Sequence, residues 1–219
     1  MDDQSAKKAD LIRIMEYTQM NYNSMWKRLH RKAHFASFVV VYYSIFLIIY
    51  SLTQIIFVKY YHEALSSYFN IIMSIVVLVY SLVNGNARYD NRISTIKEAI
   101  DAVKREKRSL QLGNTTVEEA REKYDRIIES TEYREDIDFF VTVKLLCKKY
   151  EVCWWRIPHV SSIEVNADQK RVVNYLHELS PYFLQCRIIF EFVGYVALMA
   201  VPIVIFGLCI LAKVNSWIM

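Results

Sequence analysis

Serine side chains recur at every seventh position inside two long apolar stretches of the sequence. The first serine stripe is Ser37, Ser44 and Ser51, and the second polar stripe is Ser67, Asn70, Ser74, Ser81 and Asn84. Residues seven apart drift by only about 20° around a straight α-helix, so each stripe stays on one face. Non-ionic polar groups hydrate an ion without trapping it, and they also let helices approach closely in lipid. The stripes therefore predict either the lining of a water-filled path or a helix-packing face.

A basic segment, KRLHRKAH, comes immediately before the first apolar stretch. Its candidate site residues are Lys27, Arg28, His30, Arg31, Lys32 and His34. Near an anionic leaflet each Lys or Arg contributes about 1 kcal/mol, which is the simpler interpretation. In a ring of subunits the same side chains would instead crowd the cytoplasmic mouth of a path and bind an anionic ligand there. His30 and His34 have no nearby acids or cysteines in the sequence, so we expect no metal site.

A second basic cluster, defined as Lys104, Arg105, Lys107 and Arg108, lies near the end of a predicted helix. Cations suit the negative end of a helix dipole, so a solvated face is the simpler interpretation and phosphate binding is the alternative. The sequence contains no P-loop, GxGxxG, HExxH or GxSxG motif. We therefore expect a non-enzyme, with no catalytic residues, no metal and no cofactor.

Three uncharged runs are long enough to cross a membrane as helices. The first, Phe35 to Val58, measures about 36 Å at 1.5 Å per residue, more than a hydrocarbon core of roughly 30 Å. The second, Ala64 to Ala87, follows after only KYYHE, so the two must form an antiparallel hairpin. The third, Phe192 to Ala212, contains Pro202, which membrane helices tolerate better than soluble ones.

Composition and charge predict the fold class and the topology. The 219 residues include only 4 glycines and 3 prolines, so turn-rich β architectures are excluded and an all-α membrane protein is expected. Lysine and arginine flank the hairpin but are scarce in its turn, which places the N-terminus in the cytoplasm and the C-terminus outside. We expect a basic N-terminal helix over 1–34, a transmembrane hairpin over 35–87, a cytoplasmic helical region over 88–190, and a third transmembrane helix over 191–213.

The region after the hairpin carries its own helix signals. A heptad seam predicts that the helix of the second span continues into the cytoplasm and packs on a partner: Ile93, Ile96, Ile100, Val103 and Leu110. Gly113 should end that helix, and Thr115 with Glu118 predicts a capping box that opens another. The apolar run FFVTVKLL, over 139–146, fits either a strand or a short buried helix.

The segments YNSMWKRLHRKAHFASFVVVYYSIFLIIYSL, SSYFNIIMSIVVLVYSLVNGNARYDNR and TEYREDIDFF follow one another in a characteristic layout. This layout resembles the SLATT family, the SMODS- and SLOG-associating two-transmembrane effector domains of bacteria, over residues 10–145. The resemblance implies an inner-membrane effector of anti-phage immunity that forms pores and is encoded beside nucleotidyltransferases. The third span is not part of the two-helix family name, so the resemblance implies nothing beyond residue 145.

Two functional hypotheses follow. The first is a homo-oligomeric channel, a tetramer or similar ring, because one hairpin cannot enclose a conduit; the heptad seam offers a way to assemble it. The resemblance adds gating by a nucleotide or oligonucleotide signal from an associated nucleotidyltransferase. The channel itself would also contact membrane lipids. The second hypothesis is a membrane-anchored interaction module whose spans are packed solid and whose cytoplasmic helices dock a partner.

Overall fold

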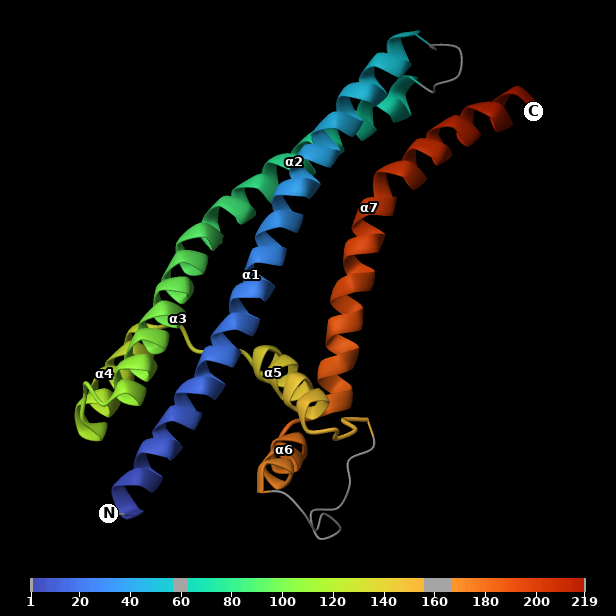
Figure 1. The fold of residues 1–219 in the computed structure, drawn as a ribbon. Helices are drawn as coiled ribbons and strands as arrows, with labels where there is room; N and C mark the ends of the chain where they lie inside the picture. The colour runs from blue at the N-terminus through green and yellow to red at the C-terminus, as the bar shows by residue number, and fades with distance from the viewer. Residues whose placement is uncertain (1, 57–62, 156–166, 219) are drawn as a thin grey trace. The chain divides into compact units, whose positions relative to one another are not determined.

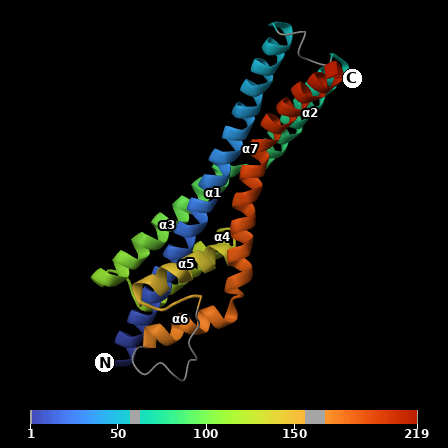
Figure 2. The same cartoon turned by 90° about the vertical axis from the view of Figure 1, so that its right-hand side faces the viewer.

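The computed structural model describes residues 2–56, 63–155 and 167–218, and its regular elements there are all α-helices. Figure 1 and Figure 2 label them as α1 (Asp2–Ile56), α2 (Glu63–Asn86), α3 (Tyr89–Leu112), α4 (Val117–Ser130), α5 (Asp136–Lys149), α6 (Ala167–Glu178) and α7 (Pro181–Ile218). The expected all-α membrane protein is confirmed. The expected turn of the hairpin, KYYHE over 59–63, lies outside the described residues except for Glu63.

The chain divides into two compact units. We call Arg31–Arg88 with Ile189–Met219 the membrane unit, and Met1–His30 with Tyr89–Ile188 the polar unit. Helices α1 and α7 are each divided between the units, with one part of the helix in the polar unit and the other part in the membrane unit. Helix α1 is unbroken in Figure 1 because its sequence contains neither glycine nor proline, so the basic N-terminal segment and the first span form one helix.

The membrane unit has an apolar exterior and an aromatic interior. Its stretches of α1, α2 and α7 are long and apolar enough to cross a membrane. Large side chains such as Ile45, Ile75 and Phe192 are exposed, as lipid-facing residues are. Inside, the Tyr50 residue is only 1% exposed, and its ring lies 4.7 Å from the Phe69 ring and 5.8 Å from the Phe206 ring.

The sequence predicts that the helix of the second span continues unbroken into the cytoplasm, but the structure shows a break. Helix α2 ends at Asn86, and α3 begins only at Tyr89. Between them Arg88 has a φ of 45°, in the left-handed region that a regular helix does not use. The Ala87 N–H bonds to the carbonyl oxygens of Val83 and Asn84, which closes the last turn of α2.

The heptad seam packs inside the polar unit. Ile96, Val103 and Leu110 are almost fully buried against the first part of α1 and against α4. On α1 the partners include Met15 and Met25, which are also fully buried. The expectation that this seam joins subunits is therefore wrong, because its apolar face is already covered by the same chain.

Local signals set the ends of the shorter helices. Gly113 follows α3 with a φ of 77°, a conformation that favours glycine, so the expected stop is confirmed. The capping box of α4 lies one residue later than expected: Thr116 accepts from the Glu119 N–H, and Glu119 accepts from the Thr116 N–H. The Thr115 hydroxyl instead bonds to that of Ser109. The run over 139–146 forms part of α5, a buried helix and not a strand.

Candidate functional site

The two polar stripes meet in the membrane unit at one hollow. Ser51 from α1 and Asn70 and Ser74 from α2 line a hollow of about 360 Å³ together with Leu47, Ile48 and Leu52. The Asn70 amide NH₂ donates to Gln54 Oε1 at 3.0 Å. Gln54 was missed in the sequence analysis, although it follows Ser51 by three residues and so shares its helix face. The hollow joins polar groups from both spans.

The remaining stripe residues have different environments. Ser37, Ser67 and Ser81 are exposed on the membrane unit. The Ser44 hydroxyl donates to the Val40 carbonyl at 2.8 Å, and Ser74 donates to the Asn70 carbonyl at the same distance. Bonds of this kind satisfy a serine hydroxyl within its own helix. The hydroxyls of Ser44 and Ser74 therefore already donate a hydrogen bond within their own helices and do not require an acceptor on another helix.

Two asparagine oxygens in the second polar stripe are not satisfied. Asn70 Oδ1 and Asn84 Oδ1 are buried and accept no hydrogen bond from the part of the chain that the structure describes. A polar group without a partner in hydrocarbon costs roughly several kcal/mol, since no water is present to replace the bond. These oxygens are therefore open to a donor from outside the described residues, such as water or another subunit.

A buried hydroxyl pair holds the hairpin together. Tyr50 Oη and Ser66 Oγ lie 2.7 Å apart, and both residues are almost fully buried. The heptad spacing points to the neighbouring Ser67. Ser66 does not fit that spacing, so no pattern in the sequence indicates its role. Packing between the first two spans thus includes a buried serine outside the stripes.

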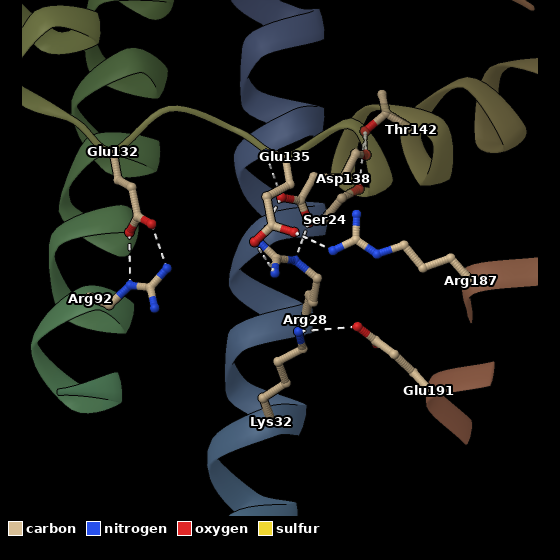
Figure 3. Close-up of polar contacts among 10 residues, drawn as sticks. All are labelled: Ser24, Arg28, Lys32, Arg92, Glu132, Glu135, Asp138, Thr142, Arg187 and Glu191. Atoms are coloured by element: carbon tan, nitrogen blue, oxygen red, sulfur yellow. Dashed lines mark hydrogen bonds and ion pairs between the residues drawn. The ribbon is translucent and has the colours of Figure 1, made fainter. Parts of the chain in front are cut away.

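Arg28 does not face a solvent-filled mouth, contrary to one of the two expectations for the basic segment. Its side chain is 5% exposed, and its guanidinium forms two bonds to Asp138, Nε to Oδ1 at 2.8 Å and Nη2 to Oδ2 at 3.0 Å. Its Nη1 bonds to Glu135 Oε1 at 2.7 Å. Figure 3 shows this fork between α1 and the start of α5. Arg28 is therefore a structural residue of the polar unit.

The acidic partners of Arg28 also begin helix α5. Asp138 is 1% exposed, and its Oδ2 accepts the Glu135 N–H at 3.2 Å, which caps the helix. Burial would lower the pKa of Arg28, but the hydrogen bonds and charges of Asp138 and Glu135 outweigh it and raise that pKa. Glu135 also meets Arg187 at 3.5 Å. The carboxylates thus serve as caps and ion-pair partners.

The other residues of the basic segment are spread over several environments. Lys32 pairs with Glu191 at 3.2 Å within the membrane unit, as drawn in Figure 3. In the polar unit the His30 ring stacks on Trp26, with centroids 5.1 Å apart. Exposed side chains remain at Lys27, His30, Arg31 and His34.

The second basic cluster divides into two parts. Lys107 Nζ lies 3.4 Å from Glu16 Oε1, so its charge is matched. The other three side chains are exposed and line a hollow of about 490 Å³ that also includes Asp101, Ser109 and Asn114: Lys104, Arg105 and Arg108. The cluster therefore supplies three side-chain cations to one surface hollow, an arrangement suited to an anion.

Metal chemistry finds no support in the described residues, where no three His, Cys, Asp or Glu side chains gather. Cys147, Cys153 and Cys186 are free thiols.

Comparison with known proteins identifies the family. The model of the SMODS and SLOG-associating 2TM effector domain family 5 matches residues 4–208. The match extends beyond residue 145, where the resemblance seen in the sequence ended, and includes α7 as far as Leu208. Searches of curated proteins and of solved structures gave no match. The chain therefore belongs to the SMODS and SLOG-associating 2TM effector domain family 5.

Proposed function

We propose that this protein is an oligomeric ion channel of the bacterial inner membrane, an effector of anti-phage immunity gated from the cytoplasm by a nucleotide-derived signal. In this proposal the N-terminus and the polar unit are cytoplasmic and the C-terminus is periplasmic, following the charge asymmetry of the sequence.

The observation that carries the proposal is the pair of buried asparagine oxygens that have no donor among the described residues, Asn70 Oδ1 and Asn84 Oδ1. Water in a path along α2 would supply both donors. The hollow beside Asn70 supports the same arrangement, since Ser51 and Ser74 line it from the two spans. In a closed ring this hollow would face the axis, and its hydroxyl and amide groups would hydrate a passing ion.

A ring needs subunit contacts other than the heptad seam, which is covered within the chain. Exposed apolar side chains that flank the stripe on α2, such as Ile71 and Leu78, offer such contacts. We propose a tetramer or similar ring in which α2 lies nearest the axis.

Gating by a nucleotide rests on cationic surfaces and on the family, whose name joins it to SMODS nucleotidyltransferase systems. Exposed cations suited to phosphates lie in the basic segment, at Lys27 and Arg31, and in the hollow lined by Lys104, Arg105 and Arg108. Arg28 is excluded as a free ligand because Asp138 and Glu135 already occupy its guanidinium.

A second candidate function is a membrane-anchored, non-conducting module that docks a cytoplasmic partner. The observation that favours it is the internal satisfaction of the hydroxyls of Ser44 and Ser74, which need no water. This arrangement does not account for the two asparagine oxygens unless another protein chain donates to both.

Ion flux from liposomes that contain the purified full-length protein alone separates the two candidates. The channel proposal predicts a flux above that of protein-free liposomes, with a change on addition of nucleotides to the side that carries the polar unit. An electrically silent protein that forms a stable oligomer would support the docking module and overturn the channel.

A further inference from the structure

A cleft of about 330 Å³ lies wholly within the polar unit, among α1, α4, α5 and α6. Aromatic side chains from each of these helices line it: Tyr17, Tyr22, Tyr124, Phe139 and Tyr175. We call it the tyrosine cleft. Its volume lies at the small end of the roughly 300–1,000 Å³ range of ligand pockets, which suits one planar ring and its immediate substituent better than a whole oligonucleotide.

One polar group in the tyrosine cleft has no partner. Asn21 is 6% exposed, and its Oδ1 accepts no hydrogen bond from the described residues. The neighbouring hydroxyls are already engaged, since Thr18 bonds to Tyr124 at 2.7 Å and Thr142 bonds to Ser24 at 3.1 Å. A buried acceptor left in this condition costs about 1–3 kcal/mol. A ligand that donates an N–H group at this point would remove that cost.

The ring contacts favour a flat ligand. Tyr175 meets Tyr17 and Phe139 edge to face, with centroids 6.4 Å and 5.3 Å away. Planar bases bind to such faces by stacking, which contributes roughly 1–3 kcal/mol for each base. Burial also raises the pKa of Tyr22 and of Tyr124, so both phenols remain uncharged near neutral pH and do not repel an anionic ligand.

A cation is fixed at the same cleft. The Arg134 guanidinium lies 3.9 Å from the Phe139 ring centroid and forms no ion pair within the described part of the chain. Glu132, which also lines the cleft, is paired with Arg92. The acidic charge is thus matched elsewhere, while Arg134 is available to an oxyanion.

From this arrangement we propose that the tyrosine cleft binds the base of a nucleotide that carries an exocyclic amino group, with Asn21 Oδ1 accepting from that amino group and Arg134 contacting a phosphate. Asparagine reads an adenine amino group in the same way in nucleic-acid complexes. The inference rests on the proposed function in one respect: the nucleotide bound here is taken to be the gating signal. Because the cleft joins α1 with α4, α5 and α6, a ligand in it would fix these helices against one another.

The test is isothermal titration of the full-length protein in detergent with AMP and with IMP, in which the amino group of adenine is replaced by a carbonyl and N1 carries a proton. We expect AMP to bind about tenfold more tightly than IMP, because IMP places a carbonyl oxygen, and not an N–H donor, against Asn21 Oδ1. This comparison uses the native protein and does not depend on a variant that folds. Equal binding of the two nucleotides, or no binding of either, would overturn the assignment.

Variants then locate the effect. Asn21→Leu should reduce AMP binding to the level of IMP, whereas Asn23→Leu, on the exposed face of the same helix, should keep the preference. Arg134→Gln should weaken AMP binding but leave adenosine binding unchanged. Retention of the AMP preference in Asn21→Leu would place the base elsewhere and contradict the proposal.

These binding results are independent of conduction. If AMP is preferred and the Asn21 variant loses the preference while liposomes show no flux, the channel proposal fails and the cleft assignment stands. If the liposomes conduct and respond to nucleotides while AMP and IMP bind equally, the cleft assignment fails and the channel proposal stands.

Discussion

The Tyr43 hydroxyl of α1 donates to the Leu198 carbonyl oxygen of α7 at 2.6 Å. In a regular helix that carbonyl accepts from the N–H four residues later, but residue 202 is a proline and has none. Tyr43 is 3% exposed and takes the place of the missing donor. Tyr42 makes a similar bond to the next carbonyl, that of Met199, at 3.1 Å. The Tyr43 side chain thus satisfies the carbonyl that Pro202 leaves without a backbone donor, which lets α7 continue to Ile218 in an apolar environment.

This relationship predicts a coupled stability effect. Tyr43→Phe should lower the free energy of unfolding of the membrane unit in detergent by about 1–2 kcal/mol, because the Leu198 carbonyl loses its donor. In a Pro202→Ala background the same change should cost less, since the substituted alanine restores the backbone N–H. A double-mutant cycle from thermal unfolding measures the difference. Equal costs in both backgrounds would show that the Tyr43 bond does not compensate for Pro202.

The Arg28 fork predicts that the basic segment contains one structural cation. Arg28→Gln should destabilise the polar unit by about 3–5 kcal/mol, because it leaves Asp138 buried without its partner. Arg31→Gln, at an exposed position in the same helix, should change stability by less than about 0.5 kcal/mol. Chemical unfolding monitored by circular dichroism compares the two. A silent Arg28 variant would mean that Asp138 is paired differently in the protein.

The proposed topology predicts a labelling pattern. With Cys153, Cys186 and Cys209 replaced by serine, Ala64→Cys should react with a membrane-impermeant maleimide in intact spheroplasts, and Asn114→Cys should not. Cys147 can remain, because burial raises its pKa to about 11 and keeps the thiol protonated at neutral pH. Asn215→Cys reports separately on the C-terminus and should also be labelled. The opposite pattern at positions 64 and 114 would invert the whole arrangement.

The two cationic surfaces make different predictions for binding of ATP as an anionic probe. Arg105→Gln with Arg108→Gln should weaken it if phosphates bind in the hollow on α3, and Lys27→Gln with Arg31→Gln should weaken it if they bind before the first span. Lys107→Gln is the matched control, since Glu16 already pairs with that lysine. In either case binding should fall as salt is added, because its origin is ionic. Binding of ATP that is insensitive to salt and to both pairs of variants would exclude these surfaces.

Most of the helices could be predicted from the sequence because their signals are local. Uncharged length identifies the three spans, and Gly113 marks the end of α3 by its backbone freedom alone. Boundaries were less certain. The capping box lies at Thr116 and not at Thr115 as predicted, because both threonines are followed three residues later by a glutamate and the sequence pattern does not distinguish them. The break at Arg88 left no glycine or proline signal at that position.

The partners of these helices could not be predicted, since partnership depends on contacts far apart in the chain. The heptad seam was recognised, but whether α1 or another subunit covers it depends on packing that no local pattern encodes. Arg28 is indistinguishable in sequence from Arg31, and only the position of Asp138, 110 residues away, makes it structural. The same holds for Asn21, whose missing partner is visible only when the surrounding helices are in place.

The central claim is that the polar stripes line water, and substitution of Ser74 tests it most directly. Ser74 is exposed beside the hollow, so a leucine there has room within the single chain. If the stripe lines a path, Ser74→Leu should elute from a sizing column as the native oligomer does, because no packed core is overfilled. Ile75→Leu, at an exposed apolar position next to it, is the matched control.

The measurement is ion flux from liposomes that contain equal amounts of oligomer. If the stripe lines water, the flux of Ser74→Leu should fall to near that of protein-free liposomes, because a ring of leucines favours dewetting. Ser74→Ala and Ile75→Leu should conduct like the native protein. Ser44→Leu in the first stripe is measured in parallel. If Ser74→Leu and Ser44→Leu both assemble and conduct normally, or if both fall apart, the stripes do not line a path and the channel account is contradicted.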